Sequence, residues 1–250
     1  MDKDGWTPLS FAAARGSWEQ GSKEIVELLL RCDDIQVDLA DKNGQTPLLF
    51  AAQSGSEDVV QLLLSCDDVK VNSTDKYGRT PLSFAAARSS WEEGSKEIVE
   101  LLLRCDDVQV DLADKNGQTP LSFAAQSGSK DVVQLLLSCH DVVVNSTHNN
   151  GQTPLSFAAE RGSMEIVQLL LSQNNIDLNS KDVDGRTPLS FSAEYGFEDV
   201  VQLLLAQADI QVDSPDINGW TPLLFSIARG SLPVVEIFLA CINERNRTLL

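Results

Sequence analysis

The chain has 250 residues, of which 42% are hydrophobic and 6% aromatic, and its formal net charge is −18. A surface this acidic repels nucleic-acid phosphates and anionic lipid headgroups and favours basic partners. No apolar run approaches the ~20 residues that span a bilayer, and the start, MDKDGWTPLS, does not have the pattern of a signal peptide. These features predict a cytoplasmic protein, with the nucleus as the alternative.

A short motif recurs along the whole chain. The triplet TPL occurs seven times, with its threonine at Thr7, Thr46, Thr80, Thr119, Thr153, Thr187 and Thr221. Repeats of about 34 to 39 residues indicate small units that stack because none can bury its own apolar face. The sequence therefore predicts an all-α solenoid, whose function lies on its surface rather than in a central catalytic pocket.

The fifth copy of the motif shows the expected elements in chain order. Thr153 is suited to cap a helix that begins at Pro154 and ends at Gly162. Ser163 begins a second helix, whose wide apolar face runs from Ile166 to Leu171. The segment 173–185 then forms a polar finger that turns at Asp-Gly. Each unit is expected to be a helix, a tight turn, a second helix and a projecting hairpin finger.

Seven such units divide the chain. Their predicted boundaries are 2–40, 41–74, 75–113, 114–147, 148–181, 182–215 and 216–250. The first and third units are longer, around SWEQGS and SWEEGS, and place Trp18 and Trp91 at equivalent positions. Two interpretations are open: the indoles are paired anchors for a partner, or each covers the adjacent helix turn, which we favour.

The pattern DxxGxTPLxxAAxxGxxxxVxxLLL resembles the ankyrin repeat over essentially the whole chain. The TPLSFAA wording is similar to the ankyrin arrays of filamentous-fungal NTPase/ankyrin receptor-like proteins. The resemblance implies a non-enzymatic scaffold for protein–protein interaction, used as the ligand-recognition array of a larger signalling or immune-type protein. A free-standing adaptor or effector, or the accessory domain of an enzyme, is the alternative.

The chain departs from that family where a glycine usually ends the second helix. The position holds Asp33, Asp67, Asp106, His140, Asn174 and Ala208. Asn and Asp tolerate left-handed backbone, whereas alanine does not. We therefore expect the helix exit at Ala208 to differ from the others or to be strained.

Cysteine recurs at one position, in Cys32, Cys66, Cys105 and Cys139. Stacked helices lie ~8–10 Å apart, and a disulfide needs Cα atoms within ~7 Å, so we expect reduced residues near helix ends. A ladder of metal ligands is the alternative, but it lacks close Cys pairs.

Two long segments of the chain are nearly identical. Residues 5–77 match residues 78–150 with eleven differences, which lie mostly at turns and finger tips. Variation on a fixed scaffold suits a recognition surface, although exposed residues also drift at little cost.

The resemblance implies that a partner docks on finger tips and the exposed side of the first helices. Arginine and aromatic side chains often carry interface energy. The candidate partner-binding residues are Trp6, Arg15, Tyr77, Arg79, Arg88, Arg161, Arg186, Tyr195, Ile217, Trp220 and Arg229, with Trp18 and Trp91 added. In an acidic chain they predict a protein or peptide partner with basic and apolar groups.

Catalytic and cofactor motifs are missing from the sequence. It contains no GxxxxGK[ST] loop, no HExxH and no GxGxxG after a strand. The Asp182–Gly185 turn fails the calcium-loop pattern, because Phe191 stands where that pattern needs glutamate. We predict no enzyme activity, no cofactor and no metal.

Both ends of the array lack the polar outer face of a capping repeat. The final RNRTLL resembles the start of a further, shortened unit. We expect end-to-end stacking or continuation into a longer array.

Overall fold

The computed structural model describes residues 1–15, 21–32, 34–88 and 95–248. Within these ranges there are fourteen helices and no strand. The helices are α1 (Pro8–Ala14), α2 (Ser22–Leu30), α3 (Pro47–Ser54), α4 (Glu57–Leu64), α5 (Pro81–Ala87), α6 (Ser95–Leu103), α7 (Pro120–Ser127), α8 (Lys130–Leu137), α9 (Pro154–Arg161), α10 (Met164–Leu171), α11 (Pro188–Tyr195), α12 (Glu198–Leu205), α13 (Pro222–Arg229) and α14 (Leu232–Thr248). We number the helix pairs as repeats, from repeat 1 (α1 and α2) to repeat 7 (α13 and α14). The all-α fold and the helix pairs are as predicted.

The first helix of every pair begins as the TPL motif predicts. In α9 the Thr153 hydroxyl accepts a hydrogen bond from the Ser156 backbone N–H at 3.3 Å, and Pro154 occupies the first turn. The two hydroxyls also share a hydrogen bond of 3.2 Å in the buried interior. The serine that follows TPL is therefore part of the cap. Gly162 ends the helix with φ +68°, in the left-handed region that glycine adopts without strain.

The second helices end in a way that the sequence did not reveal. No non-glycine residue in the described ranges has positive φ, so the expectation for Ala208 is wrong. After α12 the chain leaves through successive three-residue turns, in which Gln207 N–H donates to the Leu204 carbonyl and Ile210 N–H to that of Gln207. Because these turns keep the backbone right-handed, the exit needs no glycine.

A side chain just beyond the second helix also satisfies one of its final carbonyls. The thiols of Cys66 and Cys139 point at the carbonyls four residues earlier, at 3.6 Å. In repeats 5 and 6 the amides of Gln173 and Gln207 donate to the equivalent carbonyls, at 3.3 and 3.0 Å. The recurring cysteine is thus a small capping residue, and all five cysteines are free.

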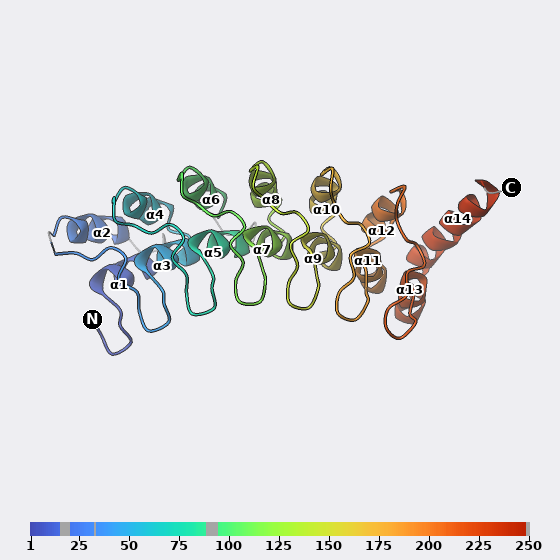
Figure 1. Cartoon of the computed structure of the whole chain (residues 1–250), viewed down its shortest axis with the longest axis horizontal. Coiled ribbons are helices and arrows are strands. Elements are labelled where there is room, and N and C mark those ends of the chain that lie inside the picture. The colour runs from blue at the N-terminus through green and yellow to red at the C-terminus, as the bar shows by residue number, and fades with distance from the viewer. Residues whose placement is uncertain (16–20, 33, 89–94, 249–250) are drawn as a thin grey trace. The chain divides into compact units, whose positions relative to one another are not determined.

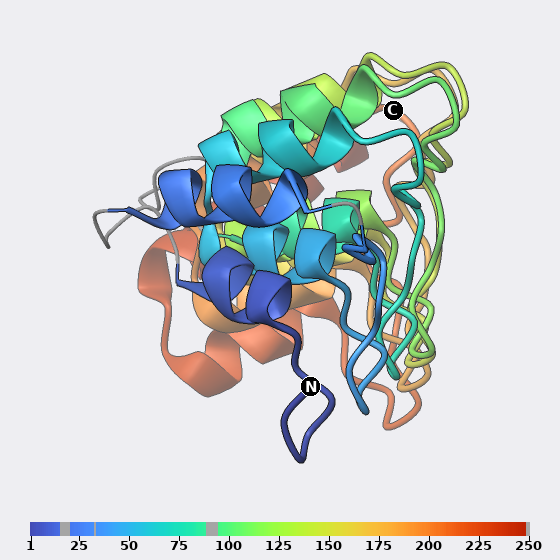
Figure 2. The ribbon, with the colours of Figure 1, turned by 90° about the vertical axis from the view of Figure 1, so that its left-hand side faces the viewer.

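The chain divides into two compact units, Met1–Val142 and Val143–Leu250. In the first, α1, α3, α5 and α7 pack side by side in one layer and α2, α4, α6 and α8 in another (Figure 1). In the second, α9, α11 and α13 form one layer and α10, α12 and α14 the other. Viewed from the α1–α2 end, the loops of the first unit gather along one side of its helices (Figure 2).

The core of each unit is a dry strip of aliphatic side chains. In repeat 2, Leu48, Ala51 and Ala52 of α3 and Val60 and Leu63 of α4 are all fully buried. Alanine at these positions lets neighbouring first helices approach closely, while leucine and valine fill the space between the layers. The same pattern recurs in repeat 5 with Leu155, Ala158, Ala159, Val167 and Leu170.

The second helix of repeat 7, α14, is longer than the second helices of the other repeats. α14 has 17 residues, whereas α12 has eight. Residues 245–248 therefore continue α14, and do not begin a further, shortened unit as the sequence had indicated.

Candidate partner-binding surface

Every finger except the fifth is held in shape by one aspartate, beginning with Asp2 in the first. In the second finger, Asp41 Oδ1 accepts the backbone N–H groups of Asn43 and Gln45, both at 2.8 Å. Asp75, Asp114, Asp182 and Asp216 hold their fingers in the same way. In the fifth finger His148 replaces the aspartate, and its Nδ1 lies 3.1 Å from the Asn150 nitrogen. The Asp-x-x-Gly pattern thus encodes a closed turn.

Neighbouring fingers are also tied to each other through the backbone. Lys76 N–H donates to the Asn43 carbonyl at 2.6 Å, and Lys115 N–H donates to the Tyr77 carbonyl at 2.8 Å. In the second unit Ile217 N–H donates to the Asp184 carbonyl at 2.9 Å. A side chain on a finger therefore stands on a rigid support, which reduces the entropy lost on binding.

One of the finger glycines shows how close this packing is. Gly151 has φ +84°, and a Cβ added there would lie 2.8 Å from the Asp182 Cα. Only glycine lets the fifth finger meet the sixth at this distance.

The first unit carries an aromatic and arginine cluster on this support. The Trp6 ring packs against Phe11 and Phe50, with centroids 4.8 and 4.3 Å apart. Arg79 is held by Asp75 through Nε and Nη2, at 3.0 and 2.8 Å. Its guanidinium lies over the Phe84 ring, 4.4 Å from the centroid, and 5.1 Å from that of Tyr77.

Tyr77 is the exposed member of that cluster. Half of its surface is accessible, and Lys76 Nζ lies 5.0 Å from its ring centroid. The side chain thus presents an apolar face with two cations beside it.

The second unit has a comparable cluster centred on an acid. Glu194 accepts a 2.6 Å hydrogen bond from Arg229 and lies 3.6 Å from Arg186 Nη1. Arg186 also pairs with Asp182 at 3.1 Å and lies over the Phe191 ring. The carboxylates of Asp75 and Asp182 are almost fully buried, and their ion pairs hold the two arginines in place.

Three of the predicted partner-binding residues in the second unit extend apolar surface to solvent. Tyr195 is half exposed and stacks beside Phe197, with centroids 6.1 Å apart. Ile217 is 70% exposed on the last finger, and Trp220 is exposed above Phe225. These three are predicted partner-binding residues that have solvent-facing area to offer.

A pairing rule at this surface escaped the sequence analysis. Where the residue before the threonine is glutamine, its amide donates to a side chain eight residues later: Gln45 to Gln53, Gln118 to Gln126 and Gln152 to Glu160. Where the residue eight positions later is Ala14, Ala87 or Ala228, the residue before the threonine is a tryptophan or an arginine instead of glutamine. That side chain lies on the phenylalanine of its own repeat, in the pairs Trp6 with Phe11, Arg79 with Phe84 and Trp220 with Phe225. The correlated substitutions were visible in the sequence as pairs eight apart.

The remaining predicted residues have other positions. Arg88 reaches back to repeat 2 and donates to the Gln53 carbonyl at 2.7 Å, so it ties two repeats together. Arg15 and Arg161 are exposed near the ends of α1 and α9. Trp18 and Trp91 lie outside the described residues.

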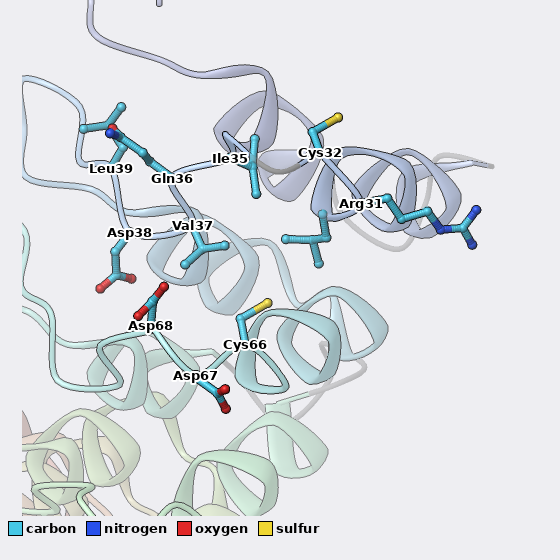
Figure 3. A pocket seen from close by; sticks show the side chains of 11 residues that line it. Arg31, Cys32, Ile35, Gln36, Val37, Asp38, Leu39, Cys66, Asp67 and Asp68 are labelled. Carbon is cyan, nitrogen blue, oxygen red and sulfur yellow. The ribbon is translucent and has the colours of Figure 1, made fainter.

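A cleft of about 630 Å³ opens between the loops that follow α2 and α4. Arg31, Cys32, Cys66, Asp67 and Asp68 are among its lining residues, and Figure 3 shows the carboxyl groups of Asp38 and Asp68 facing one another. Asp38 Oδ2 accepts the Lys70 N–H at 2.8 Å, while Oδ1 is buried without a hydrogen-bond partner. Burial raises the pKa of Asp38, and the nearby Asp68 charge adds to this increase.

Repeats 2, 4 and 5 have asparagine at the position of Asp38, whereas repeats 3 and 6 have Asp111 and Asp213 there. Asn72 Oδ1 accepts the Gln109 N–H at 2.9 Å, and its Nδ2 donates to the Asp107 carbonyl at 2.7 Å. Asn145 and Asn179 make the same two bonds to the following loops. The side chain at this position therefore links one loop to the next, and we call this series of links the loop ladder. The Asp38 carboxylate accepts a hydrogen bond from the next loop, but it cannot donate one as asparagine does.

Three of the five cysteine thiols are poorly suited to nucleophilic or metal chemistry. Burial raises the pKa of the Cys66, Cys105 and Cys139 thiols, and neighbouring aspartates add to the effect. Over the described residues, no three His, Cys, Asp or Glu side chains form a group that could hold a metal ion. In those same ranges, none of the helices has both the length and the apolar character needed to cross a bilayer.

Comparison with known proteins agrees with this architecture. The family described as ankyrin repeats (three copies) matches residues 1–75, 67–148, 90–182, 139–216 and 175–248. The crystal structure of the ankyrin repeat domain of Bcl-3, described as a unique member of the IkappaB protein family, is similar with a TM-score of 0.71 and 25% identity, covering 94% of this chain and 99% of that one. No curated protein sequence matches. The chain belongs to the ankyrin repeat family.

Proposed function

We propose that this chain is a non-enzymatic array that recognises a protein or peptide carrying basic and apolar groups. The observation that carries the proposal is the exposure of Tyr77, Tyr195 and Ile217 on fingers and first-helix ends that the backbone holds rigid. Ankyrin repeats as a family, and the Bcl-3 domain as a neighbour, support a protein-binding role.

Exposed apolar side chains supply the binding energy in this proposal. Tyr77, Tyr195 and Ile217 each leave at least half of their surface in water. Their removal from water on binding gives ~25 cal/mol for each Å² of apolar surface. Tyrosine is also among the residue types that dominate measured interfaces.

Electrostatics select the partner. The formal charge of −18 favours association with a cationic segment, and this attraction weakens as salt is added. Arg79 and Arg186 are already paired with buried carboxylates, so they are not available to bind a partner's acids. Arg79 lies over Phe84 and beside Tyr77, and Arg186 lies over Phe191, so both support the aromatic surface.

We further propose that the array is the recognition region of a larger signalling or immune-type protein in the cytoplasm, with a free-standing adaptor as the alternative. The reading frame upstream of Met1 separates the two. A P-loop sequence there supports the receptor, whereas a stop codon directly upstream supports the adaptor.

A random-peptide display selection against the immobilised chain tests the binding surface. The enriched peptides should combine Lys or Arg with aromatic or aliphatic residues. Their affinity, measured by fluorescence anisotropy, should fall by ~10-fold or more in the triple variant Tyr77→Ala, Tyr195→Ala, Ile217→Ala, which removes the anchors of both units, because about 1–2 kcal/mol is lost at each anchor that a peptide contacts.

A double variant, Gln134→Ala with Gln202→Ala, is the matched control. Both glutamines are exposed on second helices, away from the fingers. This control should bind the peptides as the parent does. Equal binding by the triple variant and the parent would show that the partner uses another face.

A further inference from the structure

The two end repeats expose apolar side chains that the interior repeats bury. In repeat 1 Ile25 is 41% exposed, whereas its counterpart Ile98 in repeat 3 is fully buried. In repeat 7 Leu224 is 45% exposed, whereas its counterpart Leu49 in repeat 2 is fully buried. Position 25 therefore belongs to the face that meets a preceding repeat, and position 224 to the face that meets a following one.

The sequences of these two faces match one internal junction. Only repeats 2 and 7 have leucine directly after TPL, in TPLLF. Repeat 2 is followed by repeat 3, whose sequence is nearly that of repeat 1, including TPLSFAAAR and SKEIVELLL. The chain thus already contains a TPLLF repeat packed against a repeat of the first kind, through α3 with α5 and α4 with α6.

From this match we propose that repeat 7 of one copy packs on repeat 1 of a second copy, in the register of the junction between repeats 2 and 3. Leu224 then takes the role of Leu49, and Ile25 the role of Ile98. The association is head to tail, so each copy keeps one face of each kind and the assembly can grow beyond a dimer.

The polar contacts of the internal junction have equivalents at the new one. At the internal junction Lys76 N–H donates to the Asn43 carbonyl. Lys3 of the first finger stands at the position of Lys76, and Asn218 of the last finger stands at the position of Asn43. At the internal junction Arg88 also donates to the Gln53 carbonyl. Arg15 of repeat 1 stands at the position of Arg88, and Ala228 of repeat 7 stands at the position of Gln53. A second copy therefore offers the same donors at the same spacing.

Two substitutions enlarge the apolar area at the end of repeat 7. Ile227 stands where repeat 2 has Ala52, and Leu232 stands where it has Glu57. Both are more than half exposed. A groove of about 370 Å³ lies between the loop that follows α12 and repeat 7, with Ile210, Leu223 and Phe238 among its lining residues. These changes favour an apolar occupant over solvent at this face.

Sedimentation velocity of the 250-residue chain over a wide concentration range tests the proposal. The wild type should form dimers and larger species as concentration rises. Leu224→Asp and Ile25→Asp should each weaken self-association by ~100-fold or more, because a carboxylate would be desolvated in the contact. Val183→Asp, at an exposed finger position outside both faces, should associate as the wild type does.

Mixing the two variants distinguishes head-to-tail from symmetric pairing. Leu224→Asp retains an intact repeat 1 face and Ile25→Asp an intact repeat 7 face, so an equimolar mixture should give a heterodimer that grows no further. Circular dichroism and thermal unfolding of each variant establish that it is folded. A monomeric wild type at every concentration, or association abolished by only one of the variants, or a mixture that stays monomeric, would each overturn the proposal.

Discussion

Repeats 1 and 3 have almost the same sequence and different surroundings. Ile98 packs between layers with repeats on both sides, while Ile25 lies at the end of the array and is partly in water. Phe84 of repeat 3 is buried, whereas its counterpart Phe11 in repeat 1 is about half exposed. The contrast teaches that in a solenoid the burial of a residue depends on its neighbouring repeats as much as on its own unit.

The largest expected effect is a difference in stability between matched isoleucines. Ile98→Ala should lower the free energy of unfolding by about 2–5 kcal/mol, because it leaves a cavity in a packed interior. Ile25→Ala should lower it by only about 0–1 kcal/mol, since the side chain is already partly hydrated. Urea unfolding of the two variants at low protein concentration measures both values. Equal losses would show that the first repeat is covered as fully as the third.

A second test compares an interior finger with the last one. Gly151→Ala should cost about 2–4 kcal/mol, because positive φ is strained for alanine and the new Cβ would meet the Asp182 backbone. Gly219→Ala has similar φ and open space around it, so it should cost about 1–2 kcal/mol. Thermal unfolding of the pair separates backbone strain from finger contact, and equal shifts would rule out a role for the contact.

The smallest expected effect concerns Asp38, the aspartate in the loop ladder. Asp38→Asn should raise the free energy of unfolding at neutral pH by about 0.5–1.5 kcal/mol, because asparagine can donate to the following loop as Asn72 does.

The pH dependence of that gain follows from the raised pKa of Asp38. The folded state holds the proton more tightly than the unfolded state, so ionised Asp38 is destabilising above its folded pKa. As pH falls through the folded pKa, this destabilisation disappears and the wild type approaches the variant. Urea titrations from neutral to acidic pH measure the difference. A gain that stays constant or grows in acid would contradict this explanation.

Much of the fold could be predicted because its signals are local. Thr153, Pro154 and Gly162 each act within a few residues, by capping, starting and ending α9, and the structure confirms all three. The exit at Ala208 was mispredicted because three-residue turns and the Gln207 amide replaced the expected glycine. The extension of α14 was missed because the repeat pattern favoured a new unit over a continued helix.

The candidate surface was harder to predict than the fold. Sequence alone identified Tyr77, Tyr195 and Ile217, which the structure places in solvent. It treated Arg79 and Arg186 as groups available to a partner, whereas buried Asp75 and Asp182 hold them. Whether an arginine faces solvent or a buried aspartate depends on the direction of its side chain at the finger. The spacing of residues along the chain does not reveal that direction. Whether any of these residues contacts a partner stays a prediction.

The near-identity of residues 5–77 and 78–150 has a consequence for how such a gene can change length. Unequal crossing-over within this tract would insert or delete a whole pair of repeats. Every junction in the lengthened protein would then be of a kind that already packs, so no intermediate form would need a new interface to fold. Expansion in pairs is therefore an evolutionary step with little structural penalty.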